Sequence, residues 1–298
     1  MMRKAIFVGA MMLLLGFSSL GQVKMNLPSF ALNHFYIVLD SSTYKAIEQN
    51  QFLRREFAVT EQRTTTRIDM SYTALYFYGK NTYFEFFDAS NQTIGQLGDG
   101  GIAFGVDQSG GLDAIKRELA SEFTVAQAPI TRQFDQKQVA WFYTAGFRDF
   151  PPDPGLRVWV MEYHPRFLAE WNPQSNSKSE GVSRKQILQR YVAVLKDKPA
   201  RPYFGDVVAL TVAVNESTQK RFAEMGKLFG YRWQVDGMTM MLEGPDIVLR
   251  LIPQTDKQRG IQEITMRVGR QPEKQTEFRF GARSVLKFHG KGLATWSF

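Results

Sequence analysis

The sequence predicts an α+β fold made of paired β-α-β-β-β modules. Two observations support this prediction. A strand pattern that ends at Asp40, a helix pattern and three further strand patterns follow one another near the N-terminus, and the same order starts again with a strand pattern that ends at Asp107. A third pass through this order occurs in the C-terminal third of the chain. A repeat of this kind indicates a fold assembled from copies of one supersecondary unit.

The first copy begins with an apolar, β-branched and aromatic run, which is typical of a buried strand. Ser and Thr then provide a helix cap, and apolar residues at helical spacing follow. A hairpin rich in Tyr and Phe, with a turn at Gly79, closes the copy. The predicted elements are strand Leu32–Asp40, helix Tyr44–Phe57, strand Val59–Ile68 and the hairpin Tyr72–Asp88.

The second copy has the same order, with a proline-rich insertion before its last strand. Leu112, Ile115, Leu119 and Phe123 lie at spacings of three and four, which predicts a helix. The predicted elements are strand Gly100–Asp107, helix Leu112–Phe123, and strands Ile130–Phe134, Gln138–Tyr143 and Leu156–His164.

A polar linker with a helix at Arg184–Lys196, residues 173–202, separates these copies from residues 203–298. That last region is expected to be a degenerate second domain. Its third copy contains strand Val207–Asn215, helix Ser217–Phe229 and strands Arg232–Val235, Met238–Leu242 and Ile247–Ile252. A fourth copy, without a helix pattern, contains strands Ile261–Val268, Glu277–Phe280, Ser284–Phe288 and Ala294–Phe298.

The N-terminus has the three parts of a secretory signal peptide. Arg3 and Lys4 precede the apolar run Ala5–Phe17, and small residues follow up to Gly21. The apolar run is shorter than the roughly 20 residues that span a bilayer, so residues 1–21 are expected to be cleaved. We therefore expect a bacterial protein that is periplasmic or secreted, with no membrane association after cleavage.

Composition excludes several classes of function. The chain of 298 residues has no cysteine, which excludes disulfides and thiolate metal sites. Its formal net charge of +8 is spread along the sequence, and no nucleic-acid-binding motif is present, so no nucleic-acid partner is expected. We expect a monomer or homodimer with a small-molecule ligand or substrate.

Glu85 is the carboxylate that the pattern makes most informative. It lies between Tyr83 and Phe87 on one face of a strand, because strand side chains alternate between faces. A charged group at an inward position is costly unless a cation, a metal or a hydrogen-bond partner compensates it. Glu85 is therefore a candidate site residue, and the other explanation is a structural carboxylate paired with an arginine.

The order of elements over residues 32–165 resembles the vicinal oxygen chelate superfamily of glyoxalases, extradiol dioxygenases and bleomycin-resistance proteins. The runs Asn33–Asp40, Tyr83–Asp88 and Val158–Pro165 carry this resemblance. The whole chain is similar to an uncharacterised, exported, glyoxalase-like family of unknown function. The resemblance implies that residues 22–172 form one glyoxalase-like domain, with modules at 32–88 and 100–165 that build a cupped mixed sheet.

The resemblance also implies a divalent metal, such as zinc, manganese, iron or nickel, held by His34, Glu85 and Glu162. Glu85 and Glu162 would be the catalytic carboxylates, and no organic cofactor is expected. The fourth ligand position falls on Gly101, which has no side chain to ligate. His164, two residues after Glu162, is the alternative fourth ligand, since residues two apart in a strand share a face.

Tyr36, Tyr83 and Trp159 are the candidate pocket residues, although aromatic residues are common in strands for packing alone. Two functions remain open. The first is a metal-dependent lyase, isomerase or dioxygenase that acts on a small substrate with two neighbouring oxygens. The second is a non-catalytic protein that holds a small molecule in the same cup without metal, and the glycine at position 101 favours it. A third reading, an interaction module without a small-molecule site, would tie Glu85 to an arginine.

Overall fold

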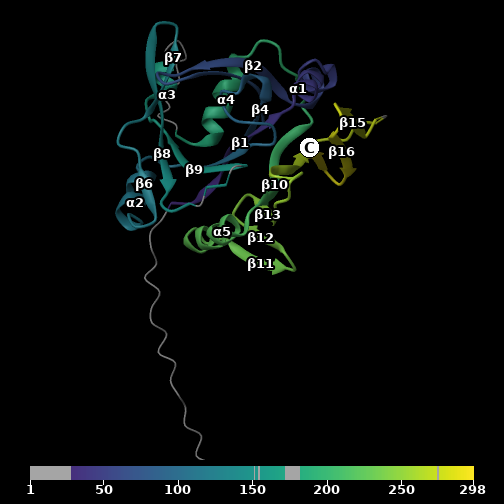
Figure 1. The fold of residues 1–298 in the computed structure, drawn as a ribbon. Coiled ribbons are helices and arrows are strands. Elements are labelled where there is room, and N and C mark those ends of the chain that lie inside the picture. Colours follow the sequence, from purple (N-terminus) through teal and green to yellow (C-terminus); the bar gives the residue numbers. More distant parts are fainter. Residues whose placement is uncertain (1–27, 151, 154, 172–181, 274) are drawn as a thin grey trace, which may run out of the picture.

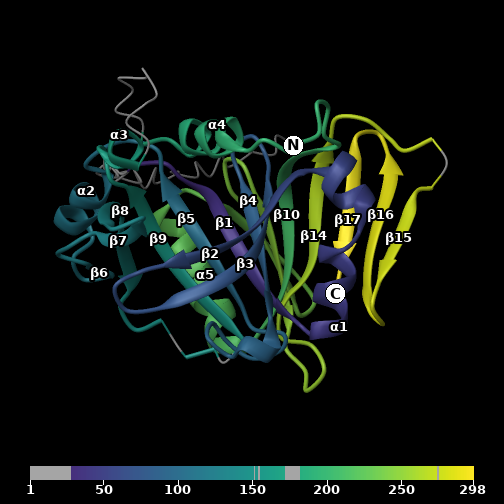
Figure 2. The same ribbon diagram turned by 90° about the horizontal axis from the view of Figure 1, so that it is seen from above.

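The computed structural model describes residues 28–150, 152–153, 155–171, 182–273 and 275–298. The predicted signal peptide and residues 173–181 of the predicted linker lie outside this part. The described chain confirms the α+β class, because two large mixed sheets carry a small number of short helices (Figures 1 and 2). None of the described helices is both long and apolar enough to cross a bilayer.

The first sheet is nine-stranded, and its strands follow the order β2-β3-β4-β1-β5-β9-β8-β6, with β7 added beside β8. The strands are β1 (Phe30–Leu39), β2 (Val59–Thr66), β3 (Ser71–Tyr78), β4 (Tyr83–Asp88), β5 (Gly100–Val106), β6 (Phe123–Val125), β7 (Ile130–Phe134), β8 (Lys137–Phe147) and β9 (Leu156–Tyr163). This sheet is the purple-to-teal part of Figure 1.

The second sheet is eight-stranded and has the corresponding order, β11-β12-β13-β10-β14-β17-β16-β15. Its strands are β10 (Phe204–Val214), β11 (Arg232–Asp236), β12 (Thr239–Glu243), β13 (Val248–Pro253), β14 (Gly260–Val268), β15 (Glu277–Phe280), β16 (Ser284–Gly290) and β17 (Leu293–Ser297). In both sheets the first strand of the half lies at the centre. β1 runs parallel to β4 and antiparallel to β5, as β10 does to β13 and β14.

The two sheets pack against each other through one shared apolar core. Phe35, Ile37 and Leu39 of β1 belong to it, together with Leu210 and Val212 of β10. Alternation in β1 turns His34, Tyr36 and Val38 to the other face of the first sheet. Each sheet therefore has one face in the shared core and one face directed away from it.

Helices cover both sides of the first sheet. On the core side lie α1 (Ser41–Glu48), α2 (Gly111–Glu118) and, from the second half, α5 (Glu216–Leu228). On the outer face lie α3 (Phe167–Trp171) and α4 (Arg184–Val194), where Leu188 and Tyr191 pack in one apolar cluster with Tyr76 and Tyr83. Figure 1 shows α4 beside the strands of the first half, to which it does not belong in sequence. The predicted linker helix is thus a wall of the first half's outer face.

Two predicted helices are shorter in the structure. The predicted helix Tyr44–Phe57 divides into α1 and a separate π-helical turn, η1 (Leu53–Phe57). Asn50 lies at the break, and its side-chain oxygen accepts a hydrogen bond from the Leu53 N–H at 3.0 Å, so a side chain replaces the helical backbone partner there. The predicted helix Leu112–Phe123 ends at Glu118, and Phe123 starts β6 instead.

A buried aspartate from the second half holds the turn between β3 and β4. The carboxylate of Asp206 accepts hydrogen bonds from the backbone N–H groups of Asn81 and Thr82 at 2.8 and 3.0 Å and from the Asn81 side-chain amide at 2.7 Å. Asp206 lies at the start of β10. The hairpin that carries Glu85 is therefore fixed partly by a residue more than a hundred positions further along the chain.

Candidate functional site

The outer face of the first sheet brings His34 and Glu85 together. His34 pairs with Tyr83 across the β1–β4 ladder, and Tyr36 pairs with Glu85 two residues further along. Since β1 and β4 are parallel neighbours, His34 and Glu85 lie on one face at adjacent positions of adjacent strands. Each side chain is only 9% exposed. The predicted inward orientation of Glu85 agrees with its burial.

A cavity of about 350 Å³ opens over this pair. Its wall comes from residues 34–94 and 130–159, is rich in aromatic residues and includes two arginines, Arg67 and Arg157. The lining includes His34, Tyr36, Tyr83, Glu85 and Trp159. The imidazole of His34 stacks on Tyr83 at 4.6 Å between ring centroids and meets the edge of Trp159 at 5.4 Å. All three predicted pocket residues thus line the same cavity.

His34 is neutral and has a defined tautomer. Burial lowers its pKa from 6.5 to about 3. Its Nδ1 lies 2.9 Å from Oδ1 of Asn33. An amide oxygen only accepts hydrogen bonds, so Nδ1 carries the proton and Nε2 carries the lone pair. The lone pair of His34 is consequently available on the side of Glu85.

Glu85 titrates near neutral pH. Burial raises the pKa of its carboxyl group to about 7, against the opposing effects of the Arg63 guanidinium and of hydrogen bonding with Tyr76. Its Oε1 lies 4.0 Å from Nε2 of His34, which is too far for a hydrogen bond. Because His34 is uncharged at neutral pH, the two groups are not an ion pair.

The pair can bind a polar group between its two members. When Glu85 is ionised, the site offers two acceptors 4.0 Å apart, Nε2 of His34 and Oε1 of Glu85. When Glu85 is protonated, it offers one donor and one acceptor. A carboxyl group with a pKa close to the working pH is also suited to proton transfer.

Gly101 is covered by two of the pocket rings. A Cβ at this position would lie 2.3 Å from the Tyr36 ring and 2.9 Å from the Trp159 ring. The space that a side chain at residue 101 would need is filled by these aromatic groups. The glycine at the expected fourth ligand position therefore has a packing role here.

The structure does not bring Glu162 to His34 and Glu85. Trp159, Met161 and Tyr163 of β9 face the outer side, so Glu162 faces the shared core side. There its carboxylate accepts hydrogen bonds from the backbone N–H groups of Gly110 and Leu112 at 2.7 and 2.8 Å. N–H groups at the start of a helix such as α2 have no partner within the helix, so the Glu162 carboxylate satisfies them and stabilises that end of α2.

His164 also lies away from the pair. It follows the last residue of β9, and its Nδ1 accepts a hydrogen bond from the Arg166 backbone N–H at 3.3 Å. Its ring lies 5.6 Å from that of Tyr143. The structure gives it the local contacts of a residue just past the end of a strand.

The positions of these residues show whether they could together hold the divalent metal that the resemblance implies. Three protein ligands are usual for a catalytic metal site, and the cup supplies His34 and Glu85. Glu162 and His164 contribute nothing on this face, and the rings over Gly101 close a further position. Among the described residues, no group of three or more His, Cys, Asp or Glu side chains could hold a metal ion. The residues present do not fit the predicted metal site.

Sequence reasoning missed two buried arginines, Arg63 and Arg132, whose charges act on Glu85. The Arg63 guanidinium lies 4.1 Å from the centroid of the Tyr76 ring and donates a 3.0 Å hydrogen bond to the Tyr78 hydroxyl. Arg132 is buried against the rings of Phe134 and Trp141. The alternation in β2 could have placed Arg63 on the inward face, but nothing in the sequence indicates that β2 lies near α4.

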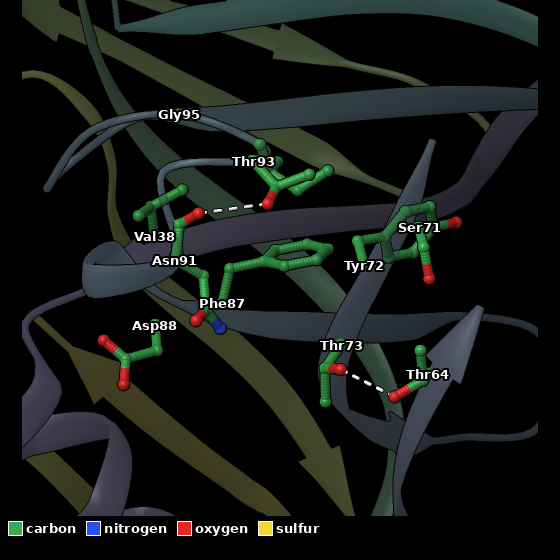
Figure 3. Close-up of a pocket in the computed structure, with 11 residues that line it drawn as sticks. Val38, Thr64, Ser71, Tyr72, Thr73, Phe87, Asp88, Asn91, Thr93 and Gly95 are labelled. Atoms are coloured by element: carbon green, nitrogen blue, oxygen red, sulfur yellow. Dashed lines mark hydrogen bonds between the residues drawn. The ribbon is translucent and has the colours of Figure 1, made fainter. Parts of the chain in front are cut away.

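A second, smaller cavity of about 200 Å³ lies at the start of β3 and the end of β4 (Figure 3). It shares Tyr72 and Phe87 with the larger cavity. Its carboxylate, Asp88, accepts hydrogen bonds from the Ser41 hydroxyl and the Ser90 N–H, and Thr64 and Thr73 bond to each other. Asp88, Thr64 and Thr73 thus already have hydrogen-bond partners, and we take the cavity over His34 and Glu85 as the candidate site.

One solved structure shares the overall fold of this chain. A hypothetical protein from Staphylococcus aureus matches with a TM-score of 0.51 and 12% sequence identity, over 89% of this chain and 97% of that chain. The "putative dioxygenase from Bacillus subtilis subsp. subtilis str. 168" matches with a TM-score of 0.27 and 12% identity, over 90% and 84% of the two chains. No curated protein matches the sequence. A family model matches residues 32–298, and the chain therefore belongs to the family of unknown function DUF5829.

Proposed function

We propose that the first half is a glyoxalase-like pair of modules whose cup binds a small aromatic molecule without a metal ion. The observation that carries this proposal is the facing pair of His34 and Glu85 at the floor of an aromatic cavity of about 350 Å³. Burying an ionisable carboxyl group in a mostly apolar cavity is costly, and the hydrogen bonds with Tyr76 and Tyr83 do not restore its ordinary pKa. A strongly perturbed pKa in such a cavity is typical of a functional site.

The ligand's ring is proposed to lie among Tyr36, Tyr83 and Trp159. Aromatic rings in such a cavity pack well against a planar ligand, and a few polar groups then fix its orientation. The ligand's polar group would lie between Nε2 of His34 and the Glu85 carboxyl. An amino or hydroxyl group has the hydrogen to donate to this pair, and a hydrocarbon does not.

The metal-dependent enzyme is the less favoured function. Only His34 and Glu85 of the predicted ligands share a face, and Gly101 is covered by Tyr36 and Trp159. A metal-free cup agrees with both observations. The signal-like residues 1–21 support action after export, where the cup would take its ligand from the periplasm or the exterior.

Three probes of nearly equal shape test the proposal, namely p-toluidine, p-cresol and p-xylene, which differ in one substituent. Their dissociation constants are measured by calorimetric titration in the presence of a chelator. We expect the amine and the phenol to bind at least about tenfold more tightly than the hydrocarbon, since one buried hydrogen bond contributes about 1.4 kcal/mol. In Glu85→Leu this preference disappears.

Arg250→Leu is the matched control, because Arg250 occupies the corresponding place in the second sheet and is exposed. It is expected to bind all three probes as the wild type does. Equal affinity for all three probes in the wild type would contradict the proposal. So would near-stoichiometric retention of zinc, manganese, iron or nickel, without chelator, by the wild type but not by Glu85→Leu.

A further inference from the structure

The edge strand β11 is exposed along its whole length. All five of its residues are exposed, with Trp233 at 46% and Val235 at 52%. The other edges of the described sheets are less open, since β2 lies against η1 and β7, β15 lies against α1, and β6 has three residues. Open edges of this kind invite pairing with another strand, and proteins usually cover them. Figure 1 places β11 at the lower margin of the described fold.

Along β11, residues whose backbone groups bond to β12 alternate with residues whose backbone groups have no partner in the sheet. Asp236 pairs with Thr239 across a two-residue loop, in which Gly237 has a φ of 57°. The residues that close such a loop direct their backbone groups at each other, so Asp236, Gln234 and Arg232 bond to β12. The N–H and C=O groups of Trp233 and Val235 therefore point outward, away from the sheet.

The sequence of β11 is complementary to itself when it is read in the opposite direction. In an antiparallel pair centred on Gln234, Arg232 faces the partner's Asp236, and Trp233 faces the partner's Val235. The outward backbone groups of Trp233 and Val235 then meet as hydrogen-bonded pairs, and Gln234 faces the partner's Gln234. We propose that β11 joins two copies of this chain around a twofold axis at Gln234.

This arrangement also covers apolar surface. Trp233 and Val235 lie opposite Leu242 and Met240 of β12, on the face that carries α5. In the dimer each Trp233 would lie beside the partner's Val235 on this face. The two eight-stranded sheets would become one continuous sheet, with both α5 helices on the same side. A five-residue contact is short, so we expect a dissociation constant in the micromolar range.

Sedimentation velocity of the mature chain, at concentrations from about 1 to 500 μM, tests the proposal. The wild type is expected to shift from the mass of one chain to that of two. In Asp236→Arg, an arginine faces the partner's Arg232, and the dissociation constant is expected to rise at least tenfold. In the double variant Arg232→Asp/Asp236→Arg the opposite charges face each other again, and dimerisation is expected to return.

Two further variants separate this contact from loss of fold. Arg279→Asp changes a charge on the edge strand β15 and is expected to leave dimerisation unchanged. Val235→Pro removes an outward N–H that the monomer does not use, so the melting temperature should hold while the dimer weakens. A wild type that stays monomeric throughout the range, or a dimer that Asp236→Arg leaves intact, would overturn the proposal.

Discussion

The two sheets have the same strand order but opposite kinds of outer face. In the first sheet, Tyr36 pairs with Glu85 on one side and Gly101 on the other, whereas in the second sheet Thr211 pairs with Arg250 and Glu263. Glu85 and Gly101 are buried, while Arg250 is exposed and Glu263 half-buried. The outer face of the first sheet carries an apolar cluster, rich in aromatic residues, that packs with α3 and α4. At the corresponding central positions of the second sheet, Thr211, Arg250 and Glu263 are polar. The shared fold requires only the core side, so the outer face of the first sheet points to a function.

The largest expected effect is a change in stability with pH that arises in the first sheet and not in the second. The folded-state pKa of Glu85, about 7, lies above its ordinary value of 4.5, so the folded protein binds the extra proton between these values. The stabilisation that the Glu85 carboxyl group contributes is therefore complete below pH 4.5. The free energy of unfolding falls by about 3 kcal/mol as the pH rises past 7. Urea unfolding of Glu85→Gln, relative to the wild type, should show a gain at pH 9 that is absent at pH 4.5.

His34 acts in the opposite direction over a lower range. Its pKa falls from 6.5 to about 3 on folding, so its contribution is complete above pH 6.5 and is lost as the pH falls towards 3. The two trends offset each other between pH 4.5 and 6.5. Arg250→Gln, in the second sheet, should unfold with the pH dependence of the wild type. An alkaline fall that persists in Glu85→Gln would show that another group causes it.

The next largest expected effect is on the free energy of unfolding, and it compares substitutions at Gly101 and Glu263. In Gly101→Val the new side chain must displace the rings of Tyr36 and Trp159, and we expect a loss of about 2 kcal/mol in the free energy of unfolding. Glu263→Val, at the corresponding place on the open face, should change it by less than about 0.5 kcal/mol. Equal effects in chemical denaturation would mean that the first face is not the more tightly packed one.

The smallest expected effect is that of a substitution at Glu162, which should lower stability without changing ligand affinity. Glu162→Ala removes the acceptor for two N–H groups of α2, and we expect it to cost about 1 kcal/mol. Because Glu162 lies on the core side, the affinity for p-cresol should stay at the wild-type value. If Glu162→Ala melts near the wild-type temperature but binds p-cresol much more weakly, Glu162 belongs to the binding site after all.

The sequence predicted most strands within a few residues, because alternation, aromatic content and turn residues are local signals. It also placed His34, Glu85, Tyr36, Tyr83 and Trp159, which share one face by strand parity. The same parity separates Trp159 from Glu162, since an odd and an even position in one regular strand face opposite ways. That local rule could have removed Glu162 from the candidate set.

Other features depend on contacts between distant parts of the chain. The packing of the two sheets on one core, and the position of α4 over Tyr76 and Tyr83, have no signal in any short stretch. The same holds for Arg63, whose partner Tyr78 lies on a neighbouring strand. Sequence patterns predict which way a side chain faces, but not what comes to cover it.

The hydrogen bonds from Asn81 and Thr82 to the Asp206 carboxylate have a consequence for how the chain folds after its synthesis. Chains are synthesised from the N-terminus, so the residues of the cup leave the ribosome well before residue 206 has emerged. Until then, the backbone N–H groups of Asn81 and Thr82 lack their carboxylate partner, and the hairpin that carries Glu85 is held less firmly. The cup thus reaches its final form only when the second half arrives, so the proposed ligand binding would begin with the finished protein rather than with the growing chain.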